Sequence, residues 1–278
     1  MSGIQLDLPE AEYHAHPAIS ATALHRVLAS PRRWRYERDH RVEKSEWDIG
    51  HAVHSRVLGI GAGTIAYPED ILTKAGSISP AAKVWAAERR AEGLIPLKAA
   101  QIAECDAVAE SVLASPKARA ILELPRQTEV ALMATDKPTG LQVRGRLDGL
   151  ALTEGSHQPL DLKTTISVDE RKLSYAIRDY GYDIQGAVYE WLAEEVYGLD
   201  ALPMVLIFVE KTAPYDVRTV SLADLAWRKG GKDRMREALD LYAACLATDQ
   251  WPGADDDGED ILPIAPPFGY YYEDLELT

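Results

Sequence analysis

Polar and apolar positions alternate with the two-residue period of a β-strand along two stretches in the middle of the chain. On the first stretch one face carries only polar residues, namely Gln142, Arg144, Arg146 and Asp148. On the second stretch, Asp161 and Lys163 lie opposite Leu160 and Leu162. Residues 153–158, which contain a glycine, are predicted to form the turn between these strands. If the strands are neighbours, charged side chains from both converge on one patch of an otherwise apolar sheet.

Periodicity predicts strands from the middle of the chain onward and helices on either side of them. The expected strands are residues 129–135, 141–152, 159–165, 204–210 and 217–222. The expected helices are residues 21–28, 31–40, 47–58, 80–92, 97–115, 116–124, 169–197 (interrupted near Gly181) and 223–246. Residues 1–17 and the glycine-rich residues 59–79 show neither period and are expected to be irregular. The first three strands follow one another closely, which predicts antiparallel pairing in part.

The composition is that of a protein with a substantial core. The chain has 278 residues, of which 46% are hydrophobic, enough for one large domain or two small ones. No apolar run approaches the roughly 18 residues that span a bilayer, and the first 17 residues lack the pattern of a secretion signal. Cys105 and Cys245 are far apart and form no metal-ligand pattern, so the sequence predicts a reduced, cytoplasmic protein.

The charge is strongly negative but unevenly distributed. A net charge of −14 argues against nucleic-acid binding over the whole surface. Residues 31–44, however, carry six Lys or Arg against three acids, whereas the last 25 residues are acidic and contain no base. A local basic groove is therefore compatible with the overall composition.

The charged residues on the two central strands form the first candidate site. Asp148, Asp161 and Lys163 have two interpretations: a charged group at the surface, with an Asp–Lys ion pair, or a buried group. In the second case, burying the two like charges is costly unless they share a cation or a proton. Two carboxylates and a main-chain carbonyl such as that of Leu162 suit Mg²⁺ or Mn²⁺. A bound metal lowers the pKa of a water molecule and offsets charge on a phosphate, while Lys163 would orient the nucleophile and stabilise the transition state.

These residues resemble a known nuclease motif. The pattern formed by Glu129, Gly145-Arg-Leu-Asp148 and Asp161-Leu-Lys163 resembles the PD-(D/E)xK nuclease superfamily, and more narrowly its RecE-type (exodeoxyribonuclease VIII) and RecB-like branch. The resemblance extends over roughly residues 13–210. It includes a helix followed by Ser-Pro in residues 19–31.

Two more motifs belong to the same resemblance. Gly50 and His54 match an early Gly-x-x-x-His, whose histidine is a metal ligand in that branch. Gln185 and Tyr189 match a Gln-x-x-x-Tyr helix, and their spacing places both on one helix face. Without the resemblance that face would be an ordinary amphipathic edge; with it, the two residues are expected to orient Lys163 or the DNA backbone.

The resemblance implies a set of metal ligands and DNA contacts. The metal ligands would be His54, Asp148, Asp161 and the carbonyl of Leu162, with Glu129 balanced between a site carboxylate and a solvated strand end. Four arginines are candidate phosphate contacts: Arg32, Arg33, Arg144 and Arg146. Each pair has an alternative, a solvated charged face for the first two and ion pairing with the site carboxylates for the last two.

The implied fold is α/β with a PD-(D/E)xK, restriction-endonuclease-like core. We expect a mixed, mostly antiparallel central sheet flanked by helices on both faces, in a single domain of residues 1–278. Residues 1–125 would form a helical N-terminal portion, 126–222 the catalytic sheet core, and 223–278 the C-terminal helix and acidic tail.

The implied function is a Mg²⁺-dependent exonuclease that hydrolyses double-stranded DNA ends, 5′→3′ and without ATP, in phage-type recombination or repair. Its expected partners are a single-strand annealing protein and further copies of the chain in a closed ring, in a bacterial or phage-infected cell. A RecB-like endonuclease or nuclease subunit, and an inactive DNA-binding relative, are alternatives. Ser30 stands where iron–sulfur members have cysteine and no cysteine follows Trp251, so we expect no such cluster; no P-loop motif is present.

Overall fold

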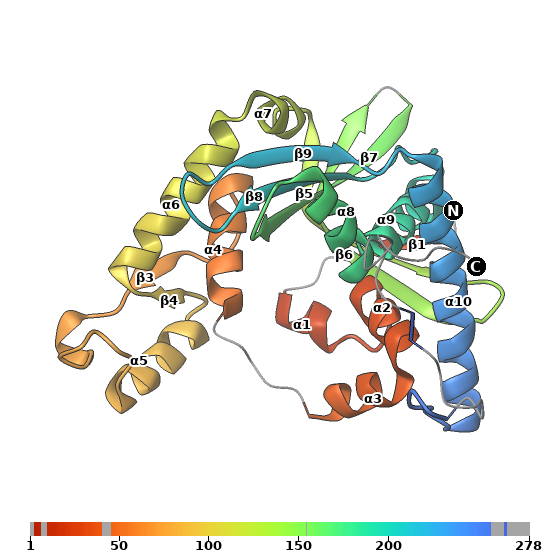
Figure 1. Ribbon diagram of the computed structural model, residues 1–278, viewed down its shortest axis with the longest axis horizontal. Coiled ribbons are helices and arrows are strands. Elements are labelled where there is room, and N and C mark those ends of the chain that lie inside the picture. The colour runs from red at the N-terminus through yellow and green to blue at the C-terminus, as the bar shows by residue number, and fades with distance from the viewer. Residues whose placement is uncertain (1–2, 7–9, 41–45, 154, 257–263, 266–278) are drawn as a thin grey trace, which may run out of the picture.

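A seven-stranded sheet forms the centre of the molecule (Figure 1). The computed structural model describes residues 3–6, 10–40, 46–153, 155–256 and 264–265. Along the sheet the strand order is β1–β5–β6–β7–β8–β9, with the short β2 paired to β6. The strands are β1 (Gly3–Leu6), β2 (Ile19–Ser20), β5 (Arg126–Thr135), β6 (Gln142–Thr153), β7 (Ser156–Thr165), β8 (Val205–Glu210) and β9 (Val217–Ser221).

The sheet is mixed and mostly antiparallel, as predicted. Neighbouring strands from β1 to β7, and β8 with β9, run antiparallel, whereas β7 pairs with β8 and β2 with β6 in parallel. A parallel pair needs a long crossover. Between β7 and β8 this crossover consists of α8 (Glu170–Asp179) and α9 (Tyr182–Tyr197).

Helices cover both faces of the sheet (Figure 1). On one face lie α2, α8, α9 and α10, and on the other α4, α6 and α7. The helices not yet given are α1 (Glu10–Ala15), α2 (Ala21–Ala29), α3 (Pro31–Asp39), α4 (Glu46–Leu58), α5 (Pro80–Ala91), α6 (Ala99–Ala114), α7 (Pro116–Leu122) and α10 (Leu225–Thr248). The two large apolar cores lie between these helices and the sheet.

Strand β8 shows why the sheet sits between two cores. Its sequence is almost wholly apolar, as expected of a strand that is buried on both faces. Leu206 and Phe208 point into the core beneath α9, and Ile207 and Val209 point into the core beneath α4 and α6. Strand β7 pairs with β8 over residues 160–165, so Asp161 and Lys163 are held beside an almost wholly buried strand.

Three local predictions are wrong. Residues 1–17 contain β1 and α1, and residues 59–79 contain β3 (Thr64–Ala66) and a 3₁₀ turn, Glu69–Ile71. These elements are too short to show a period, and β3 is a strand only because it pairs with β4 (Ile95–Leu97). The predicted turn at residues 153–158 is tighter, since Thr153 pairs with Ser156. Gly155 has a φ of 75°, the left-handed conformation that a tight hairpin needs.

The predicted interruption at Gly181 is confirmed. This residue separates α8 from α9 and adopts a φ of 70°. A Cβ atom added there would lie 2.4 Å from the His25 ring on α2, so the junction is packed against a second helix as well as turned. No helix in the described part of the chain is both long and apolar enough to cross a membrane.

Gly145 fixes how closely α9 approaches β6. A Cβ atom at this position would lie 2.8 Å from the ring of Tyr189 and 2.9 Å from Leu192. We therefore expect Gly145→Ala to lower the free energy of unfolding by about 1–3 kcal/mol, the usual range for overpacking a core, in a chemical denaturation measurement.

Gly50, inside α4, is the matched control. No atom lies within 4 Å of a Cβ added there. Gly50→Ala should be neutral or stabilising by about 0.5–1 kcal/mol, because alanine favours a helix. Equal unfolding free energies for the two variants would contradict the close packing of α9 on β6.

Candidate active site

Most of the predicted site residues line one cavity of about 500 Å³. It is bounded by β5, β6 and β7 together with residues of α2, α4 and α9. Its lining includes His54, Glu129, Arg144, Arg146, Asp148, Asp161, Lys163, Gln185 and Tyr189. These residues are spread along the sequence from His54 to Tyr189, and the fold brings them together around one cavity.

The cavity opens where the regular pairing of the strands breaks. Leu147 and Leu150 are three residues apart, yet both enter the same core, so the two-residue alternation of β6 shifts by one between them. The ladder between β6 and β7 ends at the pair Gly149–Leu160. Beyond that pair the strands separate, which leaves room for the side chain of Asp148 between them.

Strand β5 is irregular at the same level. Glu129 has a φ of 53°, rare for a non-glycine residue in a strand, and it has no ladder partner although the residues before and after it pair with β6. By register it stands opposite Asp148. The break in two adjacent strands thus brings both carboxylates to the cavity, and Glu129 lines it instead of lying at a solvated strand end.

Asp148 connects the sheet to α4. Its Oδ2 accepts a hydrogen bond of 2.7 Å from the N–H of Leu162 and lies 3.3 Å from Nδ1 of His54. Burial disfavours a charged imidazole, but Asp148 and Asp161 outweigh it and raise the pKa of His54 to about 9. Burial likewise pushes up the pKa of Asp148, yet His54 and Lys163 hold it below its usual range.

Asp161 and Lys163 form a buried ion pair at the end of β7. Lys163 Nζ lies 2.5 Å from Asp161 Oδ2, and the Asp161 residue is only 3% exposed. Burial and then the charge of Asp148 raise the pKa of Asp161 to about 6, against the effect of Lys163. Burial lowers the pKa of Lys163, but Asp161 and Asp148 exceed this effect and raise it. Lys163 is therefore an ammonium ion.

Helix α9 contacts Asp161 through Gln185, which was predicted to share a helix face with Tyr189. Gln185 Nε2 donates to Asp161 Oδ1 at 3.0 Å and to the hydroxyl of Tyr189 at 2.9 Å. The Tyr189 hydroxyl donates in turn to the backbone oxygen of Arg146 at 2.7 Å. The two side chains link a site carboxylate to the backbone of β6, so this helix face is more than an amphipathic edge.

The two arginines of β6 have different surroundings. Arg146 Nε donates to Glu129 Oε2 at 2.7 Å, in an ion pair beside the cavity. Arg144 is buried, and its Nε donates to the backbone oxygen of Ala18 at 2.8 Å while its guanidinium lies 4.3 Å from the ring centre of Tyr13. Arg146 thus pairs with a site carboxylate, and Arg144 attaches the N-terminal segment to the sheet.

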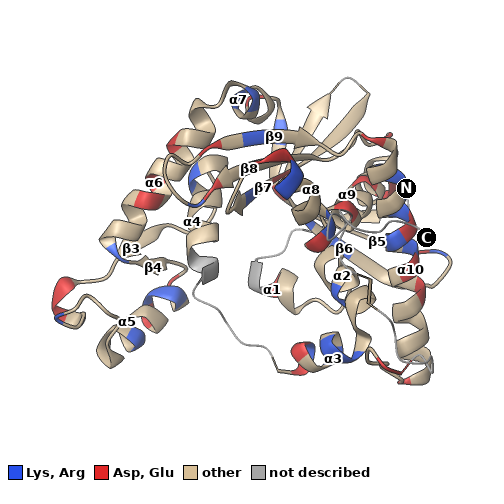
Figure 2. Ribbon diagram, in the orientation of Figure 1, with Lys and Arg blue, Asp and Glu red and all other residues tan. Residues whose placement is uncertain are grey.

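Arg32 and Arg33 do not line the cavity. They belong to α3, which carries four arginines and two acidic residues (Figure 2). Arg33 Nε lies 3.0 Å from Glu37, and the Arg32 guanidinium contacts Asp256. Among the described residues, these two arginines are already paired with acids.

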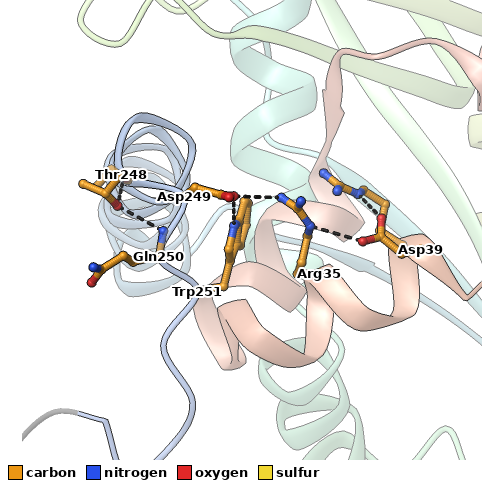
Figure 3. Close-up of polar contacts among 8 residues, drawn as sticks. Arg35, Asp39, Thr248, Asp249, Gln250 and Trp251 are labelled. Carbon is orange, nitrogen blue, oxygen red and sulfur yellow. Dashed lines mark hydrogen bonds and ion pairs between the residues drawn. The ribbon is translucent and has the colours of Figure 1, made fainter.

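A third arginine of α3, Arg35, connects this helix to the residues that follow α10. Figure 3 shows Arg35 between Asp39 and Asp249, with Trp251 beside it. The Trp251 ring stacks on Trp34 at a centroid distance of 5.3 Å. These contacts attach the segment after α10 to α3.

The side chains fit a divalent metal ion. Ligand atoms of His54, Glu129 and Asp148 lie within 4.8 Å of one another, and one imidazole nitrogen with carboxylate oxygens is a donor set that divalent metal ions bind. Asp161 lies outside this group of three. Its Oδ2 is buried and, although close to Lys163, accepts no well-directed hydrogen bond from any described residue. Buried carboxylates in this arrangement are stabilised by an additional cation.

Comparison with family models identifies the fold. The model described as "PDDEXK-like domain of unknown function (DUF3799)" matches residues 32–259. The chain is a member of this PDDEXK-like family. The resemblance to the PD-(D/E)xK superfamily is therefore confirmed, and the matched residues include all of the predicted metal ligands.

One solved structure supports the same fold. A crystal structure of a "putative exonuclease" from Eubacterium rectale superimposes with a TM-score of 0.60 at 14% identity, over 94% of this chain and 97% of that one. The structure of SSO0001 gives a TM-score of 0.36 at 15% identity, covering 83% and 81%, which is too low to support an argument. Comparison with curated protein sequences gives no match.

The sequence left the place of Glu129 open, and in the structure this residue lines the cavity. His54 is placed on α4 by Ala52 and Val53, which are fully or almost fully buried, so that the helix face bearing His54 turns toward the cavity. The backbone of Leu162 also reaches the site, through its N–H; the predicted metal ligand is its carbonyl, which remains a prediction.

Metal binding to this site should release a proton at neutral pH. With a pKa of about 9, His54 is protonated at pH 7 and must lose that proton before its nitrogen can bind a metal. Apparent Mg²⁺ or Mn²⁺ affinity should therefore rise with pH up to about 9. Calorimetry in two buffers of different ionisation enthalpy should show release of about one proton per metal. His54→Gln should abolish this buffer dependence; an unchanged proton count would exclude His54 as a ligand.

Proposed function

We propose that this protein is a metal-dependent deoxyribonuclease that degrades double-stranded DNA from its ends. The observation that carries the proposal is the buried group of Asp148, Asp161 and Lys163 at the break between β6 and β7, with His54 and Glu129 facing it. Carboxylates and an ammonium ion at one cavity suit the attack of water on a phosphodiester, in which negative charge develops on phosphate oxygens. The PDDEXK-like fold supports this reaction class.

The metal ligands in this proposal are His54, Glu129, Asp148 and Asp161, with the carbonyl of Leu162. When bound, Mg²⁺ or Mn²⁺ supplies Lewis acidity and lowers the pKa of a coordinated water. The chain itself keeps Asp148 ionised for this role, whereas His54 must first lose a proton. Asp148 has a lowered pKa, and the Leu162 N–H fixes one of its oxygens.

Lys163 contributes positive charge. Its raised pKa keeps it protonated, so it stabilises negative charge on the phosphate and orients the water rather than accepting a proton. Its side chain is 22% exposed and lines the cavity, which makes it accessible to a substrate. Gln185 is a positioning residue that fixes Asp161, and Tyr189 fixes the strand carrying Asp148.

Arginines at the cavity extend the proposal to the DNA backbone. Arg146 is 22% exposed in its side chain and pairs with Glu129, and a metal held by Glu129 would free the guanidinium for a phosphate. Arg144 lies beside it on the same face of β6. Arg32 and Arg33 on α3 are exposed and are assigned a weaker, salt-sensitive contact with DNA further from the cut.

The substrate and setting are part of the same proposal. We assign 5′→3′ polarity, independence of ATP, a ring of identical subunits and a single-strand annealing partner in recombination or repair, in the cytoplasm. The similarity to the RecE-type branch supports these assignments, and the described neighbour from Eubacterium rectale supports an exonuclease over an endonuclease. A ring would reconcile the net charge of −14 with DNA binding if acidic surfaces faced outward and the cavity faced inward.

The decisive experiment compares linear and closed circular DNA. With Mg²⁺, the protein should release mononucleotides from end-labelled linear duplex, faster from the 5′ label, and leave the circle intact. EDTA should stop the reaction. Cleavage of the circle would favour the endonuclease alternative, and no cleavage of either would favour an inactive DNA-binding protein.

Lys163→Ala tests the catalytic assignment. Removing a preorganised positive charge at a phosphate should lower kcat by about 10²–10³-fold. Lys229→Ala is the matched control, because that lysine is 79% exposed on α10 and pairs only with Asp233 among the described residues. Equal rates for the two variants would remove Lys163 from the mechanism.

A further inference from the structure

Lys163 has a second partner besides Asp161. Its Nζ lies 4.9 Å from the centre of the Tyr182 ring. The face of an aromatic ring carries partial negative charge and attracts an ammonium ion, most strongly where water is excluded. Tyr182 is half-buried and contacts Phe208 of β8 at a centroid distance of 6.0 Å, so its ring is supported from below by the core.

The position of Tyr182 follows from the turn at Gly181. The left-handed conformation of Gly181 and its close approach to His25 fix where α9 begins, and Tyr182 is the first residue of that helix. Gln185 and Tyr189 follow at three and seven positions, on the same helix face. One face of α9 therefore contacts both members of the Asp161–Lys163 pair, the carboxylate through Gln185 and the ammonium ion through Tyr182.

The ring differs from the carboxylates in how it responds to a metal. Asp148 and Asp161 are proposed metal ligands, and a bound cation would neutralise part of the charge by which they attract Lys163. The Tyr182 ring has no net charge and is outside the ligand set. Its attraction for the ammonium ion persists when the carboxylates are engaged.

We propose that Tyr182 is the positioning residue of Lys163, which keeps the ammonium ion at the cavity when the metal occupies the carboxylates. The proposal rests on the nuclease function proposed above and concerns the same site. The interacting part is the ring face rather than the hydroxyl group. Tyr182→Phe should therefore behave like the wild type, whereas Tyr182→Leu should not.

The kinetic test uses three variants on linear duplex with Mg²⁺. Tyr182→Leu should lower kcat about tenfold with little change in KM, as expected for loss of one cation–π contact in a sheltered site. Tyr182→Phe should retain most of kcat. Tyr180→Leu is the matched control, because Tyr180 is 66% exposed and its ring contacts Tyr182 at 5.8 Å. An unchanged kcat in Tyr182→Leu, or an equal loss in Tyr182→Phe, would overturn the proposal.

A measurement without metal or DNA tests the contact itself. In two-dimensional ¹H–¹³C NMR spectra, the ε-methylene signal of Lys163, assigned by its loss in Lys163→Arg, should be shifted upfield by the ring current. The shift should persist in Tyr182→Phe and in Tyr180→Leu. It should vanish in Tyr182→Leu; a signal at the same position in that variant would contradict the contact.

A graded series covers the case in which Tyr182→Leu fails to fold. Phenylalanine analogues with one, two and three ring fluorines at position 182 keep the size of the ring and progressively weaken its negative face. The logarithm of kcat should fall steadily with the number of fluorines, and a flat series would overturn the proposal. A wild-type protein with no nuclease activity refutes the function; an active wild type with a flat series refutes only the role of Tyr182.

Discussion

The structure depends on keeping two carboxylates close together inside a sheet. Asp148 and Asp161 occupy adjacent strands and are mostly buried, with the Asp148 side chain 14% and the Asp161 residue 3% exposed, so their like charges repel. Such a pair exists only if the surroundings supply positive charge and hydrogen-bond donors. The chain supplies an imidazole, an ammonium ion, a main-chain N–H and an amide side chain. In the proposed nuclease, a bound metal ion would complete this compensation.

The backbone around these two carboxylates is irregular in a way that makes room for them. Regular pairing between β6 and β7 would fill the space between the carboxylates with main-chain hydrogen bonds, and the break after Gly149–Leu160 prevents that. The left-handed residue Glu129 repeats the break in the next strand. Gly145 then allows α9 to lie close enough for its side chains to reach across the strands. Local irregularity, rather than flexible loops, creates the site.

Sequence periodicity predicted the regular parts well. It located the five longer strands and most helices, because each buries one apolar face and therefore keeps its period. Asp161 and Lys163 were recognisable because charge inside an apolar strand is rare. The short β1 and β3 showed no period, since their partners and not their own residues make them strands.

Other features of the site had no signal of their own in the sequence. His54 was found through resemblance to a family, since a single histidine on a helix has no distinguishing pattern. The side of the sheet on which Glu129 lies depends on one backbone torsion angle and could not be deduced from alternation. The pairing of Arg32 and Arg33 with acids depends partly on Asp256, which is more than two hundred positions away. Side-chain chemistry was readable from the sequence, and long-range pairing was not.

The parallel pairing of β7 with β8 has a consequence for synthesis of the chain. The strand that carries Asp161 and Lys163 gains its neighbour only after α8 and α9 have been made, because β8 extends to Glu210. Tyr182, Gln185 and Tyr189 lie within the same intervening segment. While the first 165 residues are emerging from a ribosome, both acids are present but their buried surroundings are not. The cavity is therefore assembled late, as a product of non-local folding, and a nascent chain that ends before β8 lacks the strand that pairs with β7 beside the cavity.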